Sequence, residues 1–165
     1  TDRPASIRDL LLQYSAVFKG TDHQVDTYFD VPKGRLKLRQ GNIENTLIQY
    51  HRDNEASAKL SEVQLHFPQD GASLLRVLKA ALAEKVVVDK NREIYFIDNV
   101  KFHLDEVKGL GSFVEIEAID ETGELSLETL RHQCDHYIQL LEIQATDLIR
   151  HSYSDLLLEN MTKSK

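Results

Sequence analysis

The 165-residue chain has the length of a single domain, and we expect one domain over residues 1–165. Its formal net charge of -7 argues against nucleic-acid binding, since cations drive binding to phosphate backbones. Its apolar stretches are far shorter than the roughly 20 residues of a membrane-spanning helix, and its single cysteine, Cys134, rules out an intrachain disulfide. We therefore expect a cytoplasmic protein with no nucleic-acid or membrane partner.

The first predicted element is a helix. Apolar residues recur at helical spacing from Ile7 to Phe18, and they follow Thr1, Asp2 and Pro4, which suit a helix start. The pattern predicts a helix that continues to Phe18.

Four strands are predicted next, because the chain either alternates apolar and polar residues or carries β-branched and aromatic ones. Turn residues at positions 32–34 and 41–42 separate the first three strands. The predicted strands cover residues 23–31, 35–40, 46–53 and 60–67.

The second half of the chain adds helices and longer strands. Asp70 can cap a short amphipathic helix, Ser126 can cap a helix that runs to about Thr146, and a last short helix follows Ser152. Between the helices that begin near Asp70 and Ser126, the pattern predicts an antiparallel meander of three strands, at residues 86–97, 100–107 and 112–119. This order predicts an α+β fold with an antiparallel sheet, open or closed.

Charged residues two apart in a strand share one face of the sheet. The sets that do so are Arg35, Lys37 and Arg39; Lys90 and Arg92; Lys101, His103 and Asp105; and Glu115 and Glu117. A sheet with one face in water explains such a pattern. However, cations on the early strands and carboxylates on the last one favour a polyphosphate ligand with a divalent metal.

Four segments together resemble one known family. They are HQVDTYF at 23–29, GRLKLR at 34–39, HLDEVKGLGSFVEIE at 103–117 and HSYSDL at 151–156. The chain is similar to the CYTH, or triphosphate tunnel metalloenzyme, superfamily, and within it to the class IV adenylyl cyclase branch. The resemblance implies an eight-stranded antiparallel β-barrel with flanking helices, in which basic residues bind a triphosphate and acidic residues hold two metal ions.

The resemblance also implies roles for individual residues. Lys90 and Arg92 look like the catalytic basic pair, while Asp105, Glu115 and Glu117 look like the site for Mg²⁺ or Mn²⁺. His103 is open between a phosphate contact and a buried core histidine. The implied substrate-binding residues are Arg35, Lys37, Arg39, Arg52, Lys90, Arg92, Lys101 and His103.

The implied function is a metal-dependent enzyme that converts ATP to cyclic AMP and pyrophosphate. An inorganic or nucleoside triphosphatase on the same site is one alternative, and a non-catalytic polyphosphate- or nucleotide-binding module is another. The expected partner is a small-molecule triphosphate, ATP or tripolyphosphate, and homodimerisation is left open. The family's alternating Glu-x-Glu-x-Lys strand, expected just before Thr1, is not in the sequence. Either a short stretch precedes Thr1, or the protein lacks one strand, two metal ligands and a lysine.

Two competing signals carry less weight. His132 and His136 flank Cys134 at a spacing that resembles a metal site, but helical periodicity puts both histidines on the polar face and Cys134 on the apolar stripe. We interpret the histidines as solvated. The sequence also contains neither a Gly-x-Ser-x-Gly motif nor a Gly-rich phosphate loop that opens a helix, so those enzyme classes are not expected.

Overall fold

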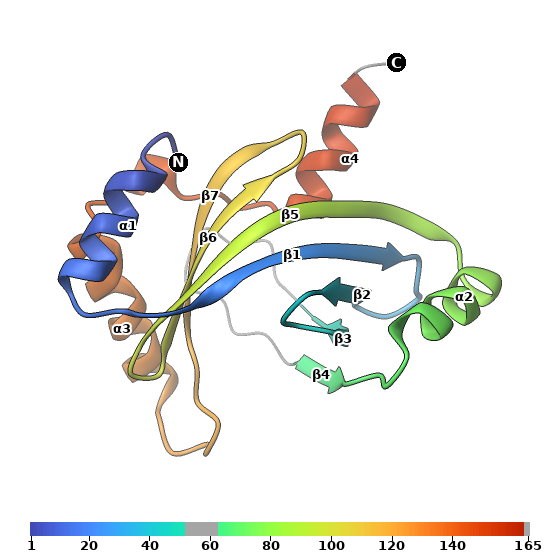
Figure 1. Ribbon diagram of the computed structural model, residues 1–165, viewed down its shortest axis with the longest axis horizontal. Helices are drawn as coiled ribbons and strands as arrows, with labels where there is room; N and C mark the ends of the chain where they lie inside the picture. The colour runs from blue at the N-terminus through green and yellow to red at the C-terminus, as the bar shows by residue number, and fades with distance from the viewer. Residues whose placement is uncertain (52–62, 164–165) are drawn as a thin grey trace.

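The computed structural model describes residues 1–51 and 63–163, which form an α+β fold built on one antiparallel sheet (Figure 1). The strand order is β4-β3-β2-β1-β5-β6-β7. The strands are β1 (Val17–Phe29), β2 (Arg35–Gly41), β3 (Thr46–Tyr50), β4 (Val63–His66), β5 (Glu84–Ile97), β6 (Val100–Val107) and β7 (Gly111–Ala118). The helices are α1 (Pro4–Gln13), α2 (Gly71–Ala81), α3 (Leu127–Leu140) and α4 (Tyr153–Lys163), with a 3₁₀ turn, η1 (Ala145–Asp147).

The two faces of the sheet have opposite character. The outer face carries Tyr95 and Phe102, which pack with Ile7 and Leu11 of α1 and with Leu141 after α3. Figure 1 shows α1 and α3 lying together beside this part of the sheet. Because side chains alternate along each strand, burying this apolar set turns a second set of charged residues to the inner face, namely Lys90, Arg92, Lys101, Asp105, Glu115 and Glu117.

A smaller apolar cluster closes one end of the inner face. Val86, Val88 and Val107 pack there with Tyr153 and Leu157 of α4. The helix that follows Ser152 is thus confirmed, and it anchors the C-terminal segment against the sheet. Among the helices of the described residues, none is long and apolar enough to cross a membrane.

The first helix is shorter than its apolar periodicity predicts. The helix α1 ends at Gln13, and Phe18 lies in β1 instead. Ser15 adopts a left-handed conformation with φ 60°, and the N–H of Ala16 donates to the carbonyl of Leu11 at 2.9 Å. Such a turn terminates a helix, and apolar residues beyond it continue the helical spacing only by coincidence.

The third helix also ends early, at Leu140 rather than near Thr146. Glu142 takes a left-handed φ of 54°, and the N–H of Ile143 donates to the carbonyl of Ile138 at 2.9 Å. Two such bonds close a Schellman turn, and this is the one that spans more residues. The turn satisfies carbonyls at the helix end.

The expected eight-stranded barrel is not confirmed. The described residues supply seven strands, and the sheet they form is not closed, with β4 and β7 as its edges. The strand predicted to run to residue 53 ends at Tyr50. Arg52 lies outside the described residues, so its predicted role in substrate binding is not placed by the structure.

Candidate functional site

The inner face of the sheet borders a hollow of about 1740 Å³. All seven strands of the described residues contribute to it, together with residues of α1 and α3, residues around η1 and the start of α4. The predicted site residues that line this hollow are Lys37, Arg39, Lys90, Arg92, Lys101, His103, Glu115 and Glu117. Strand alternation therefore brings five cations and two carboxylates from four strands into one space.

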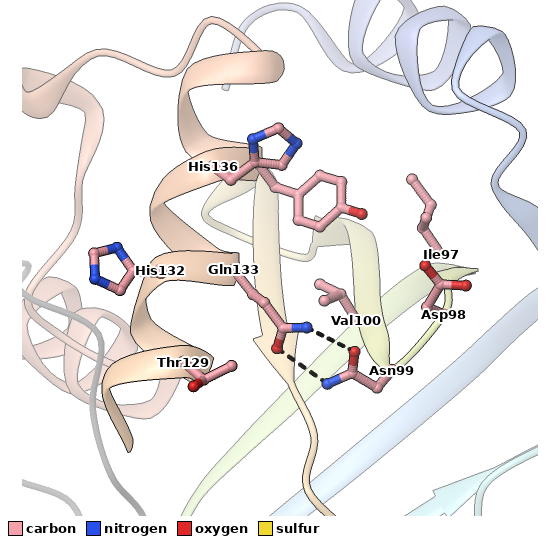
Figure 2. A pocket seen from close by; sticks show the side chains of 9 residues that line it. Ile97, Asp98, Asn99, Val100, Thr129, His132, Gln133 and His136 are labelled. Carbon is pink, nitrogen blue, oxygen red and sulfur yellow. Dashed lines mark hydrogen bonds between the residues drawn. The ribbon is translucent and has the colours of Figure 1, made fainter. Parts of the chain in front are cut away.

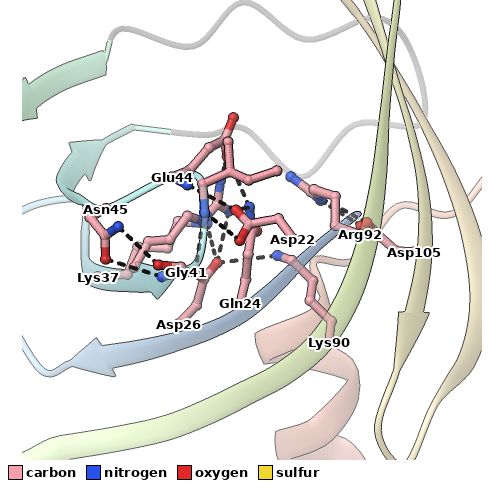
Figure 3. A network of polar contacts seen from close by, with 12 residues as sticks. Asp22, Gln24, Asp26, Lys37, Gly41, Glu44, Asn45, Lys90, Arg92 and Asp105 are labelled. Carbon is pink, nitrogen blue, oxygen red and sulfur yellow. Dashed lines mark hydrogen bonds and ion pairs between the residues drawn. The ribbon is translucent and has the colours of Figure 1, made fainter. Parts of the chain in front are cut away.

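A buried carboxylate from β1, Asp26, contacts three of these cations, and Figure 3 shows it with Lys37 and Lys90. Asp26 accepts hydrogen bonds from Lys37 Nζ at 2.9 Å, from Lys90 Nζ at 3.2 Å, and from two nitrogens of Arg39 at 2.8 and 2.9 Å. Its side chain is 1% exposed. Although burial raises the pKa of Asp26, the cations Lys37 and Arg39 outweigh burial and hold the pKa well below its usual range.

A second carboxylate, Glu44, enters the hollow from the β2–β3 turn. It binds Arg39 at 2.8 Å and also pairs with Lys101. Buried Asp22 of β1 fixes this turn by accepting the backbone N–H groups of Ile43 and Glu44 at 2.8 and 2.9 Å. Burial raises the pKa of Glu44, but the hydrogen bond and charge of Lys101 outweigh it and lower the pKa to about 2.

Arg92 lies between Asp105 of β6 and Glu115 of β7. Its Nε donates to Asp105 at 2.7 Å, and its terminal nitrogen contacts both Asp105 and Glu115. Tyr153 of α4 donates its hydroxyl hydrogen to the same Asp105 at 2.8 Å. Both oxygens of Asp105, which is 2% exposed, are thus engaged by protein donors.

His103 lies beside Glu115, with 3.2 Å between His103 Nδ1 and a Glu115 oxygen. Burial, then the charge of Arg92, lowers the pKa of His103 to about 4, so the ring is neutral near pH 7. A neutral ring that donates from Nδ1 to the carboxylate presents a lone pair on Nε2, for which the described residues offer no hydrogen-bond partner. His103 is therefore buried and also lines the hollow. A buried core histidine and a phosphate contact, the two roles left open by the sequence, do not exclude each other here.

Lys90 is the most deeply buried of the lysines in the hollow. Its side chain is 2% exposed, and its ammonium lies 5.5 Å from the ring centre of Tyr153. Burial, and next the charge of Arg92, lowers the pKa of Lys90 to about 8. A bound polyanion would favour the charged form of Lys90, so ligand binding and protonation of this residue are linked.

Arg35 contacts the start of α4 and not the carboxylates that bind the other cations. Its guanidinium binds Ser152 at 2.6 Å and Asp155 at 2.9 Å, at the beginning of α4. It is not among the residues that line the hollow. Arg35 therefore holds α4 on the sheet, although strand alternation groups it with Lys37 and Arg39.

The metal expected from the family resemblance can be compared with these carboxylates. Among residues 1–51 and 63–163, no three His, Cys, Asp or Glu side chains form a ready cluster for a metal ion. Glu115 and Glu117 both line the hollow, and the Glu115 side chain is 42% exposed. One or two carboxylates suffice for Mg²⁺ when substrate phosphates supply further oxygens, so this pair fits such an ion. Asp105, with both oxygens engaged, fits it less well in this arrangement.

Sequence reasoning missed the polar residues of β1 and of the flanking turns. Asp22, Gln24 and Asp26 are all fully buried on the inner face. Their alternation was a usable signal, because three polar residues two apart inside a strand predict a polar buried face. Glu44 and Tyr153 lie outside the strands, so no strand periodicity points to them.

A second, smaller cavity of about 300 Å³ lies between the β5–β6 turn and α3 (Figure 2). Asn99 and Gln133 exchange two amide hydrogen bonds across it, at 2.8 and 3.1 Å. His132 and His136 are exposed, which confirms that they are solvated. The amide pair ties the turn to α3 and gives this cavity a structural role.

Comparison with known proteins assigns the family. The CYTH domain model matches residues 3–153. No curated protein gives a significant match. Among solved structures, a protein of Pyrococcus horikoshii is similar at 23% identity, with 92% of each chain covered and a TM-score of 0.78. A Vibrio parahaemolyticus protein, for which an adenylate cyclase activity has been suggested, is similar at 20% identity, with 96% of this chain and 93% of that chain covered and a TM-score of 0.76.

At these identities, the solved structures show the fold alone. The family model goes further, because it spans nearly all of the sequence from α1 to the start of α4. The chain belongs to the CYTH domain family.

Proposed function

We propose that this protein is a metal-dependent triphosphate-processing enzyme that, like an adenylyl cyclase, converts ATP to cyclic AMP and pyrophosphate. The observation that carries the proposal is the convergence of five cations on one hollow that Glu115 and Glu117 also line. The family match supports it, since CYTH proteins are in general triphosphatases or cyclases. The fold shared with the Vibrio parahaemolyticus protein is consistent with it.

In this proposal the cations bind and orient the polyphosphate. Arg39 and Arg92 carry planar guanidinium groups suited to phosphate oxygens, while Lys37, Lys90 and Lys101 add point charges. Negative charge grows on the leaving pyrophosphate during the reaction, and these groups are already held in place by carboxylates. Preorganised charge of this kind stabilises the transition state without reorganisation.

Glu115 and Glu117 are the proposed ligands for Mg²⁺ or Mn²⁺, which would polarise the phosphate and lower the pKa of the attacking hydroxyl. Asp105 is assigned instead to Arg92, whose guanidinium it orients from both oxygens. His103 contacts Glu115 and lines the hollow, and its buried Nε2 has no hydrogen-bond partner among the described residues. We assign to it a hydrogen bond from substrate.

Product analysis with ATP and Mn²⁺ tests the proposal. We expect cyclic AMP and pyrophosphate from the wild-type protein, and loss of turnover in Glu115→Gln, which keeps the volume but removes the anionic oxygen. ADP and phosphate would instead identify a triphosphatase on the same site. If ATP is not consumed, release of phosphate from tripolyphosphate would identify an inorganic triphosphatase, and binding of tripolyphosphate without hydrolysis would identify a binding module. If the protein neither consumes ATP nor binds tripolyphosphate, the proposal is wrong.

A further inference from the structure

Asp26 is the point where three cations of the hollow meet, although its own carboxylate does not line the hollow. The cations come from two strands on either side of β1, namely Lys37 and Arg39 from β2 and Lys90 from β5. Asp26 lies opposite Arg39 in the β1–β2 register. One buried carboxylate on β1 thus holds the cations of β2 close to the cation of β5.

We propose that Asp26 is a positioning residue that fixes the geometry and the charge state of the polyphosphate-binding cations. This inference rests on the proposed function, because it concerns how the same hollow binds its ligand.

The burial of Asp26 among protein donors argues against a direct role as a ligand for metal or substrate. One oxygen accepts from Arg39 Nε, and the other accepts from Lys37, Lys90 and a terminal nitrogen of Arg39. Four protein donors therefore surround the carboxylate, three of them on the same oxygen. The side chain is 1% exposed and negatively charged, so it neither reaches a phosphate nor attracts one. Asp26 therefore acts only through the cations.

The cations keep donors for a ligand after they bind Asp26. An ammonium group has three N–H donors, and Lys37 and Lys90 each use one of them on Asp26. Arg39 uses two nitrogens on Asp26 and one on Glu44. Three positive charges face the two carboxylates Asp26 and Glu44 in this group, so it retains one net positive charge toward the hollow.

Lys90 makes this arrangement measurable, because its charge depends on Asp26. Removing a carboxylate 3.2 Å from a buried ammonium disfavours the charged form of the lysine. The charged and titratable groups that face Lys90 are Arg92 on β5, Lys37 and Arg39 on β2, Asp26 on β1, Glu115 on β7 and Tyr153 on α4. In this set, Asp26 is the carboxylate in direct contact with the Lys90 ammonium.

The test is calorimetric titration with tripolyphosphate in metal-free buffer, from about pH 6 to about pH 10. Wild type, Asp26→Asn and Asp89→Asn are compared. Asp89 is the matched control, because it precedes Lys90 on β5 but pairs with His23 and Lys108 outside the hollow. Protonation of tripolyphosphate is common to all three proteins and cancels in the comparison.

We expect the affinity of Asp26→Asn to begin falling about one pH unit or more below the wild-type onset, while Asp89→Asn keeps the wild-type profile. Asp26→Glu retains the charge but moves the carboxylate by one methylene, so we expect the wild-type onset with about tenfold weaker binding at every pH. This variant decides the question on its own if Asp26→Asn does not fold.

An unchanged onset in folded Asp26→Asn, or wild-type affinity in Asp26→Glu, would overturn the positioning role and leave the proposed function standing. Absence of tripolyphosphate binding by the wild-type protein at every pH would overturn the proposed function itself, and the role of Asp26 with it.

Discussion

Tyr153 donates its hydroxyl hydrogen to Asp105 at 2.8 Å, across a sequence separation of 48 residues. The ring of Tyr153 also packs against Phe113 at 4.9 Å between ring centres and lies over the Lys90 ammonium. The beginning of α4 is thereby joined to the same carboxylate that orients Arg92. The start of α4, Asp105 and Arg92 therefore form one structural unit, and docking of α4 affects the geometry of the hollow.

Tyr153→Phe removes only the hydroxyl from this unit. Asp105 keeps its bonds to Arg92 but loses one donor while buried, so we expect the free energy of unfolding to fall by about 1 kcal/mol. Tyr153→Ala also removes the ring contacts and should cost more, about 3 kcal/mol. Urea denaturation measures both values. A Phe variant as stable as wild type would show that the hydroxyl contributes nothing to stability.

Arg92→Met should strongly destabilise the protein. It leaves the buried carboxylate of Asp105 without its cation, and such a loss typically costs about 3 kcal/mol or more. The double variant Arg92→Met/Asp105→Leu removes both charges and should recover much of the lost stability. A double-mutant cycle by thermal or urea unfolding measures the coupling. Simple additivity of the two single changes would contradict the pairing.

The burial of Lys90, which lowers its pKa, should make the free energy of unfolding depend on pH. Its pKa is about 8 in the folded protein and about 10.5 for an ordinary lysine of the unfolded chain, so between these values the unfolded chain binds more protons. The free energy of unfolding of wild type, relative to Lys90→Met, should therefore rise with pH across this window. At about 1.4 kcal/mol per pH unit the total rise is about 3 kcal/mol. A difference that is flat from pH 8 to 10.5 would contradict this burial.

Gly41 tests the turn that carries Glu44. A Cβ at Gly41 would lie 2.7 Å from the buried carboxylate of Asp22 and 2.7 Å from the carbonyl of Glu44. We expect Gly41→Ala to lower stability by about 1 to 3 kcal/mol, because neither neighbour can move freely. Gly71→Ala is the control, since its Cβ meets only Gln40 at ordinary contact distances of 3.8 and 3.9 Å. Thermal unfolding of the two variants should differ clearly, and equal melting temperatures would refute the close approach.

The sequence predicted the family, the antiparallel α+β class and most strand positions. It also predicted which charged residues share a face, because strand alternation depends only on local geometry. Lys90 and Arg92 on β5 thus lie with Lys101 and His103 on β6, as their spacing requires. The CYTH family is confirmed by the model match over residues 3–153.

The sequence did not predict which side chains pair across neighbouring strands. Whether Asp26 meets Arg39 depends on the β1–β2 register, and whether Arg92 meets Asp105 depends on the β5–β6 register. Arg35 shows the same limit, since the position of α4 decides that it binds Asp155. Closure of the sheet depends likewise on how edge strands meet, which no local pattern determines.

Tripolyphosphate titration with Mg²⁺ tests the central claim most directly, namely that the charged hollow is the triphosphate site. Lys37→Met removes a cation of the hollow, whereas Lys79→Met removes an exposed lysine of α2 that pairs with Glu84. We predict binding by the wild-type protein, at least about tenfold weaker binding by Lys37→Met, and a change of no more than about twofold in Lys79→Met. Absence of wild-type binding, or equal losses in the two lysine variants, would contradict the account.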